Sequence, residues 1–370
     1  MENLNINKFS APMPFMTEHI ELLAKINERH SASKITMLYN CLPANAIDCS
    51  GFEQLRCHDD RIKSLNDLIP LVQLSRSLGM DFTYLLNSVN TPHPDIFRKE
   101  QWRFRNFLEQ LLENGITKLR ISNTQIADYV MQNYPHFTIY SSTSQEYYSL
   151  KQYANLFNHF TEMKEVVPTW DINKNFTFIK NFKLRFPDKI LELMVNEGCI
   201  GGCPFRRDHH ASNVKYHAAD KHDRFTHFFS SSCSALSDRD KALYICLSNI
   251  IYPWEISTYN KYGIYNFKLI GRNSPDFRYD TKYLERFDSY LSGIENPDSI
   301  MDAPFIDFNH YLIFYQPLKN LKVKDIIEFL PKIEHFEKNG HLCASICGAS
   351  CHYCYDCAKK MWTEFEKWRK

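Results

Sequence analysis

The chain has 370 residues, of which 44% are hydrophobic and 14% aromatic, so it can bury a large core. Its 44 basic and 43 acidic residues give a formal net charge of +1, which excludes an overall electrostatic attraction to nucleic acid or to an anionic membrane. A local basic patch that binds nucleic acid is not excluded. The sequence has no stretch of about 18 apolar residues that could cross a membrane. Residues 1–14 lack the apolar run of a signal peptide. We therefore expect a cytoplasmic protein with no membrane partner.

Strand-like stretches alternate with helical ones along the chain. The expected strands lie at residues 35–43, 81–87, 118–122, 137–142, 165–170, 189–196, 250–252 and 266–270. Helical stretches follow most of them, at residues 65–78, 95–113, 124–133, 145–157, 176–185, 255–262 and 281–291. Eight such units over about 260 residues match the size of a (β/α)8 barrel. The predicted fold class is therefore α/β, a TIM-like barrel, and a doubly wound open sheet is the alternative.

The alternation stops after roughly Gly293. We expect residues 1–300 to form the barrel, with a long insertion after the sixth expected strand. Residues 301–370 are expected to form a cysteine-rich C-terminal extension that packs on the barrel and ends in a short amphipathic helix.

The twelve cysteines are unevenly placed along the chain. In a reducing cytosol we do not expect these cysteines to form disulfides. Their clustering favours metal binding over the alternative of buried, apolar cysteine.

One cysteine group begins with the segment EGCIGGCPFRRDHH, where the sixth expected strand ends. In a barrel this is the catalytic face. The spacing Cys199-x3-Cys203, with three glycines, lets the loop curl so that both thiolates face one point, and its backbone N–H groups can bond to cluster sulfides. Cys233 and Cys246 can return to this face, and Cys41 ends the first expected strand. Five cysteines thus compete for the four positions of an iron–sulfur cluster, and either Cys246 or Cys41 is left as a buried small residue.

Four polar residues are candidates for catalysis at the same face. His210 and Arg206 follow the cysteines in the loop, where substrate binding or proton transfer would suit them. Glu197 ends the sixth expected strand and Arg272 ends the last one, where a cation often meets an anionic substrate. The alternative for Glu197 is a barrel-core ion pair with Lys268.

A second cysteine group lies near the C-terminus. Its members follow one another at spacings of four, four, three and three residues: Cys343, Cys347, Cys351, Cys354 and Cys357. Packing alone does not explain five cysteines in so short a stretch. Four of them could hold zinc tetrahedrally, and a second [4Fe-4S] cluster is the alternative.

Several of these segments resemble the U-thirty-two collagenase-like peptidase family. They are LELMVNEGCIGGCPFRRDHH, LYNCLP, FTYLLN and GIYNFKLIGR, and the tail CGASCHYCYDCAKK resembles the branch of that family with a cysteine-rich C-terminus. The resemblance implies a [4Fe-4S] cluster held by Cys199, Cys203 and Cys233, with Cys246 or Cys41 as the fourth ligand. Relatives of this kind act in oxygen-independent hydroxylation of ubiquinone precursors, tRNA or ribosomal RNA. The sequence departs from them in its short C-x3-C spacing and in lacking their Ser-Gly-Arg-Cys stretch, so their substrates are not carried over.

Three functions follow as hypotheses. The first is an iron–sulfur enzyme, or enzyme subunit, for oxygen-independent hydroxylation or a related modification of a small molecule, RNA or peptide. The second is a peptidase, as the family name suggests, although no nucleophile or water-activating metal stands out. The third is a non-catalytic electron-transfer or scaffold partner of a second barrel protein.

Overall fold

The architecture is a parallel eight-stranded sheet. The computed structural model describes residues 6–42, 62–87, 94–197, 199, 201–206, 238–271, 281–308, 321–343 and 350–368. The strands are β1 (Asn7–Pro12), β2 (Ser33–Asn40), β3 (Asp81–Leu86), β4 (Lys118–Ile121), β5 (Thr138–Ser141), β6 (Glu165–Val166), β7 (Ile190–Met194) and β8 (Asn266–Lys268). Their order is β5-β4-β3-β2-β1-β8-β7-β6, and each hydrogen-bonded pair is parallel.

The two edge strands of this sheet, β5 and β6, approach each other and nearly close the ring. The backbone N–H of Val167 donates to Ser141 Oγ at 3.3 Å, and Thr143 Oγ1 donates to the carbonyl of Pro168 at 2.8 Å. Side chains rather than a backbone ladder therefore bridge the seam. This confirms the predicted α/β class with a TIM-like barrel.

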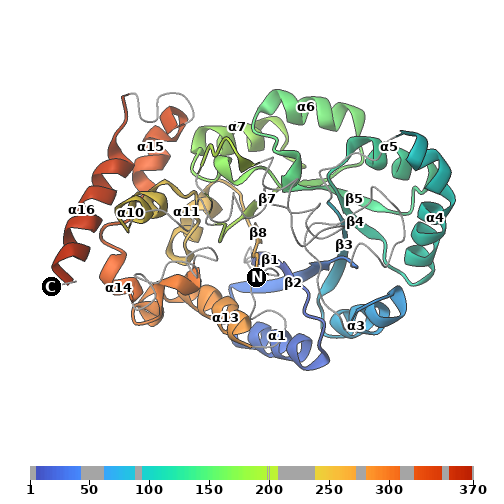
Figure 1. Cartoon of the computed structure of the whole chain (residues 1–370), viewed down its shortest axis with the longest axis horizontal. Helices are drawn as coiled ribbons and strands as arrows, with labels where there is room; N and C mark the ends of the chain where they lie inside the picture. The colour runs from blue at the N-terminus through green and yellow to red at the C-terminus, as the bar shows by residue number, and fades with distance from the viewer. Residues whose placement is uncertain are drawn as a thin grey trace, which may run out of the picture.

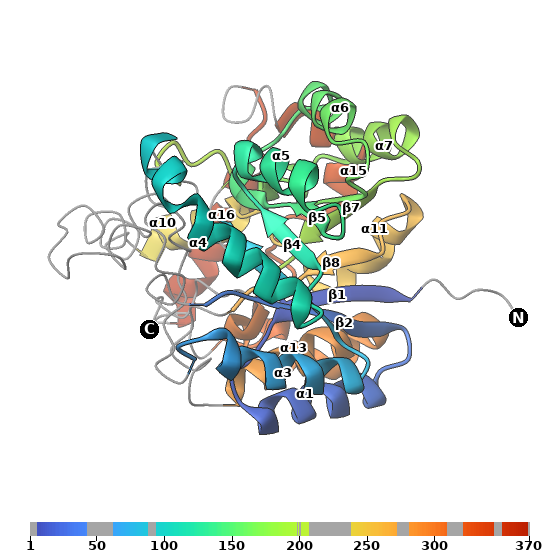
Figure 2. The ribbon, with the colours of Figure 1, turned by 90° about the vertical axis from the view of Figure 1, so that its right-hand side faces the viewer.

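Helices surround the strands (Figures 1 and 2). They are α1 (Thr17–Arg29), α3 (Leu65–Ser77), α4 (Pro94–Glu113), α5 (Thr124–Asn133), α6 (Leu150–His159), α7 (Phe176–Arg185), α10 (Asp238–Leu247), α11 (Ile256–Lys261), α13 (Lys282–Glu295), α14 (Val323–Ile326), α15 (Ile333–Cys343) and α16 (Tyr353–Trp368). Within the described parts of the chain, no helix has the length and apolar character that crossing a bilayer requires.

Local sequence decides where several of these helices begin. Asn123 accepts hydrogen bonds from the backbone N–H groups of Gln125 and Ile126 through Oδ1, at 2.9 and 3.1 Å, and so caps α5. Ser149 and Gln152 bond reciprocally at the start of α6, at 3.0 and 3.3 Å. Such caps satisfy N–H groups that the first turn leaves without a helical partner.

Two parts of the expected strand pattern are wrong. The barrel begins with β1, which lies between β2 and β8 and was not expected. Its sequence NKFSAP lacks a clear strand signal, yet Phe9 and Ala11 are fully buried. Residues 250–252 form no strand in the structure. Ile250 and Ile251 are fully buried in the core, where the N–H of Ile251 donates to Val195 at 2.9 Å. The run is apolar because it is buried, so its sequence resembles a strand. It nevertheless forms no backbone ladder with a neighbouring strand.

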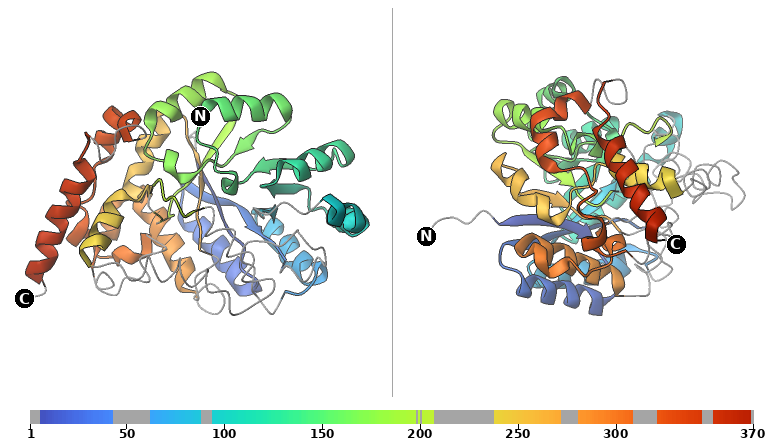
Figure 3. Two further views of the ribbon diagram at one scale, coloured as in Figure 1. Left: turned by 45° about the horizontal axis from the view of Figure 1, so that its top comes forward. Right: turned by 90° about the vertical axis from the view of Figure 1, so that its left-hand side faces the viewer.

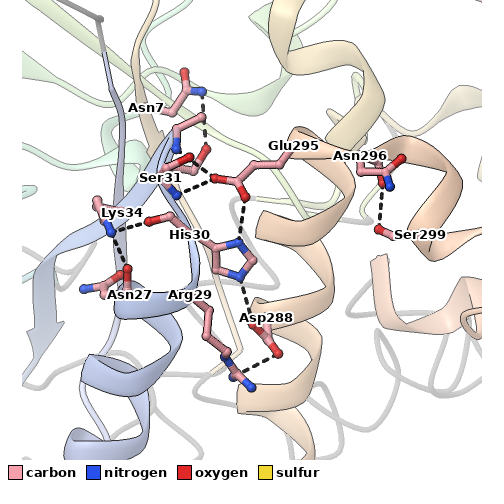
Figure 4. Close-up of polar contacts among 12 residues, drawn as sticks. Asn7, Asn27, Arg29, His30, Ser31, Lys34, Asp288, Glu295, Asn296 and Ser299 are labelled. Carbon is pink, nitrogen blue, oxygen red and sulfur yellow. Dashed lines mark hydrogen bonds and ion pairs between the residues drawn. The ribbon is translucent and has the colours of Figure 1, made fainter.

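The amino-terminal end of the barrel is held by a polar cluster between the α1–β2 turn and α13 (Figure 4). The His30 ring nitrogens lie 2.8 Å from Asp288 Oδ1 and 3.3 Å from Glu295 Oε2. The N–H groups of Ser31 and Ala32 donate to Glu295 Oε1, both at 2.7 Å. Since α13 follows the last strand, these contacts join the end of the barrel to its beginning.

Charged side chains also fill part of the barrel interior. Arg120 from β4 lies 2.6 Å from Glu192 Oε2 and 3.0 Å from Glu165 Oε1, on β7 and β6. Lys268 from β8 places its Nζ 4.2 Å from the centre of the Tyr39 ring. Buried charges persist when they are paired in this way. The network thus connects strands from around the ring.

The C-terminal extension packs on one side of the barrel. Helix α15 contacts α7, and α16 contacts α10 (Figures 1 and 3). A Cβ added at Gly340 would overlap the backbone oxygen of Lys174 and would lie 3.2 Å from the N atom of Phe176. Only glycine therefore allows α15 to approach this closely. The division of the chain at residue 300 stays a prediction.

Candidate functional site

The loop that follows β7 begins at the carboxyl end of the barrel, in a fixed position. Asn196 makes two hydrogen bonds to the backbone of Ile270, one through Nδ2 at 2.9 Å and one through Oδ1 at 2.8 Å. The next residue, Glu197, is buried, and its Oε1 accepts the backbone N–H of Cys199 at 3.0 Å. The carboxylate of Glu197 thus orients the first cysteine of the loop.

The thiols of Cys199 and Cys203 lie within hydrogen-bond distance of each other. The Cys199 thiol donates to the Cys203 sulfur, which lowers the pKa of Cys203 to about 6 against the opposing effect of burial. The backbone N–H groups of Phe205 and Arg206 favour the Cys203 thiolate further. The same thiol–thiol bond, together with burial, raises the pKa of Cys199. Two neighbouring sulfurs, one of which accepts backbone N–H groups, are features that metal–thiolate sites share.

Arg206 fastens the loop to the segment that follows β6. Its guanidinium donates to Asp171 through Nη1 at 2.6 Å and Nη2 at 2.9 Å, and to Thr169 Oγ1 at 3.2 Å. It also stacks over the Trp170 ring, 4.0 Å from the ring centre. Asp171 Oδ1 accepts the N–H of Gly202 at 3.1 Å. The buried Arg206 therefore positions the loop beside the two thiols, and the role in substrate binding or proton transfer expected for it stays a prediction.

The other side of the loop lies against the end of α10. Gly201 donates its N–H to the carbonyl of Leu247 at 3.3 Å. A Cβ at Gly201 would lie 2.6 Å from Asn249 Nδ2, so the glycine permits a close approach. Asn173 Nδ2 donates to the carbonyls of Met194 and Asn249, at 2.7 and 2.9 Å. The cysteine loop is therefore held from both sides by segments that pack on the barrel.

Sequence reasoning missed Asp171 and Asn249. Asp171 immediately follows the fifth expected strand, and position at the carboxyl end of a barrel strand is a signal that could have marked it. Asn249 precedes an apolar run without any such signal. Neither partner could be assigned from sequence, because both contacts join segments that are distant along the chain.

The structure places the other two cofactor-ligand candidates in different surroundings. Cys41 follows β2 directly and is fully buried within the hydrophobic core. Cys246 lies in α10 and is also buried. The ionisable groups that act on Cys246 are Cys357 and Cys354 of α16. Cys246 is therefore associated with the C-terminal cysteines.

Several predicted site residues lie outside the described residues, namely His210, Arg272, Cys233, Cys347 and the side chain of Cys343. Of the remaining tail cysteines, Cys351, Cys354 and Cys357 are partly buried. Among the residues that are described, no three His, Cys, Asp or Glu side chains are grouped so as to hold a metal ion. The loop contributes two described thiols, so a cluster there would need donors from elsewhere.

No protein-family model matches the chain, and no curated protein matches it. Among solved structures, a U32 peptidase is similar over 72% of this chain and 92% of its own, at 9% identity and a TM-score of 0.48. A maltogenic α-amylase from Thermotoga neapolitana is similar over 54% of this chain and 60% of its own, at 8% identity and a TM-score of 0.35. The SrfJ protein from Salmonella typhimurium is similar over 72% of this chain and 64% of its own, at 12% identity and a TM-score of 0.36.

These likenesses are distant in sequence, and all three TM-scores lie below 0.5. The barrel architecture therefore rests on the strand order and pairing described above. The activity of this chain has to be argued from its own residues, because one fold supports many unrelated functions.

Proposed function

We propose that this chain is an iron–sulfur protein whose Cys199–Cys203 loop binds a [4Fe-4S] cluster at the carboxyl end of the barrel. In that role it would catalyse or support oxygen-independent hydroxylation or a related modification. The observation that carries the proposal is the pairing of the Cys199 and Cys203 sulfurs, with backbone N–H groups directed at Cys203. Thiolates are the usual ligands of such clusters, and hydrogen bonds to their sulfurs tune the reduction potential.

Some of the proposed cluster ligands are described residues, and the others are taken from the family resemblance. Cys199 and Cys203 supply two thiolates, and Cys233, outside the described residues, matches the third. Cys41, at the end of β2, is the fourth candidate that we favour, because Cys246 interacts with the C-terminal cysteines instead. When bound, the cluster would supply electrons or activate an oxygen donor.

The residues around the thiols would set the geometry of the loop. Glu197 orients the backbone at Cys199, and Asp171 holds both Arg206 and the N–H of Gly202. The positive charge of Arg206 favours the Cys203 thiolate. Partners of this kind, one layer outside the ligands, typically fix ligand orientation and tune a metal site.

The test is to purify the protein anaerobically and to count iron and acid-labile sulfide per chain. We expect about four irons with matching sulfide for the loop cluster, and their loss in Cys199→Ser and Cys203→Ser. A matched control is Cys246→Ser, which should keep this iron. Iron and sulfide that are absent from the folded wild-type protein, or unchanged in both loop variants, would contradict the proposal.

Each of the two alternative functions has its own test. Cleavage of a peptide by aerobically prepared, iron-free protein would support the peptidase. Stable co-purification with a second barrel protein, together with inactivity of the chain alone, would support the non-catalytic partner.

A further inference from the structure

A hollow of about 400 Å³ lies between α5 and α6, two neighbouring helices on the outside of the barrel (Figures 1 and 2). Helix α5 contributes Gln125 and Asp128 to its lining, and these residues share one face because they are three positions apart. Helix α6 contributes Asn155, Leu156 and His159, which lie on one face for the same reason. The volume falls in the range of small-ligand sites, about 300–1,000 Å³.

The floor of this hollow is apolar and is held in place by the core. Leu156 and Phe160 are 5% and 3% exposed and belong to the hydrophobic core. Tyr147, which precedes α6, is half-buried, and its ring packs edge-on against Tyr153 with 5.8 Å between ring centres. The floor therefore offers a ligand a fixed apolar surface and, at Tyr147, an aromatic ring of the kind that attracts cations.

The lining carries a carboxylate without a permanent cation beside it. Among the described residues around the hollow there is neither lysine nor arginine, and Asp128 supplies the carboxylate. Its Oδ1 lies 3.1 Å from His159 Nε2, and its Oδ2 accepts from Gln132 Nε2 at 2.9 Å. The side chains of Asp128 and His159 are 41% and 62% exposed, and such exposed pairs contribute little to stability. A ligand cation can therefore replace the imidazole at Asp128 at little cost.

Side-chain amides add further acceptors to the same lining. Gln125 and Asn155 are exposed, and neither side chain has a hydrogen-bond partner within the described parts of the chain. Gln152 differs from them, because its Oε1 already accepts the N–H groups of Tyr148 and Ser149, at 3.1 and 3.0 Å. The carbonyl oxygens of Gln125 and Asn155 are thus available to a ligand that donates hydrogen bonds.

We propose that this hollow binds an alkyl guanidinium group, which is a planar cation carried on an apolar stem. The cation meets Asp128, and the stem lies on Leu156 and Phe160. The guanidinium has five N–H donors and no acceptor, so it can bond to the carboxylate and to the amide oxygens of Gln125 and Asn155 together. Charge complementarity excludes an anionic ligand, because no lysine or arginine in this lining would offset its repulsion by Asp128.

The test is a titration of the full chain with n-butylguanidinium, followed by saturation transfer to the ligand and by the backbone amide shifts of the protein. The control ligand is n-butylurea, which keeps the shape and the apolar stem but is neutral. We expect n-butylguanidinium to bind about tenfold more tightly than n-butylurea, with amide shifts concentrated at residues 124–128 and 147–160. Equal binding of the two ligands, or shifts only elsewhere in the chain, would overturn the proposal.

Substitutions on the surface separate binding from folding. Asp128→Asn removes the charge but can still bond to His159 and Gln132, so binding should weaken about tenfold. Asn155→Lys places a competing cation in the hollow and should abolish binding. The matched control is Asp188→Asn, which lies outside the lining and is 75% exposed, and it should bind like the wild type. Unchanged binding in a folded Asp128→Asn protein would show that the proposal is wrong.

A third ligand, N-acetylarginine amide, distinguishes two sources of the same chemistry. If it binds as tightly as n-butylguanidinium, the site accepts the arginine side chain of a peptide. If it fails to bind while n-butylguanidinium binds, the ligand is a free small molecule. The hollow shares no residue with the Cys199–Cys203 loop, so this inference is independent of the proposed function, and the titration does not require bound iron.

Discussion

The contact between Asp171 and Arg206 gives a sharp test of how the cysteine loop is held. In Asp171→Asn the charge of the acceptor is lost, while the guanidinium of Arg206, whose side chain is 6% exposed, stays in place. Removing one partner of a fully buried pair costs about 3–5 kcal/mol, and an exposed pair contributes about 0–1 kcal/mol. Asp171 is 31% exposed, so we expect an intermediate loss of about 2 kcal/mol in the stability of the loop, or about 30-fold in its opening equilibrium.

The assay is native-state hydrogen exchange of the amides at residues 199–206, which reports local opening. Their exchange should become about 30-fold faster in Asp171→Asn, and the amide of Gly202, which donates to Asp171, should be affected most. The matched control is Asp188→Asn. Asp188 is 75% exposed and lies 3.8 Å from Lys189, so its change should stay within about 0.5 kcal/mol. Equal exchange in wild type and Asp171→Asn would refute the role of Arg206 as a clamp.

Two further predictions concern the barrel itself. Burial and the charge of Glu192 raise the pKa of Glu165 to about 7 from an ordinary 4.5, so between these pH values the folded state holds a proton that the unfolded state releases. The free energy of unfolding should therefore fall by up to about 3 kcal/mol as the pH rises through this window. Urea unfolding of Glu165→Gln should lack this fall. A variant with the same pH profile as the wild type would contradict the prediction. Gly340→Ala should destabilise the docked α15 by about 1–2 kcal/mol, because overlap with the Lys174 backbone outweighs the gain in helix propensity. The exposed Lys338→Ala on the same helix should change stability by less than about 0.5 kcal/mol, and stabilisation by Gly340→Ala would count against close packing there.

The barrel could be predicted from the sequence because a barrel is built from locally repeated units. Each βα unit shows a short apolar strand followed by a helical period, and both patterns arise from neighbours along the chain. Seven of the eight strands of the ring were recognisable in this way, at slightly different bounds. The position of Cys199 and Cys203 followed as well, since a loop after a barrel strand must lie at the carboxyl end.

Strand β1 shows where the local pattern stops being informative. Its six residues include serine and proline, so no periodicity distinguishes it from a loop. It becomes a strand because β2 and β8 offer it backbone partners on both sides. The apolar run at 250–252 shows the reverse, since it is buried as deeply as a strand but bonds to other segments.

In the candidate site, too, some features could be predicted from the sequence and others could not. The chain itself determined which residues carry sulfur and how the two loop cysteines are spaced. Only the tertiary structure decided that Asp171 holds Arg206 and that Cys246 interacts with Cys354 and Cys357. The physical reason is that spacing along the chain records local conformation, whereas the partner of a side chain depends on which distant surfaces the closed barrel brings into contact.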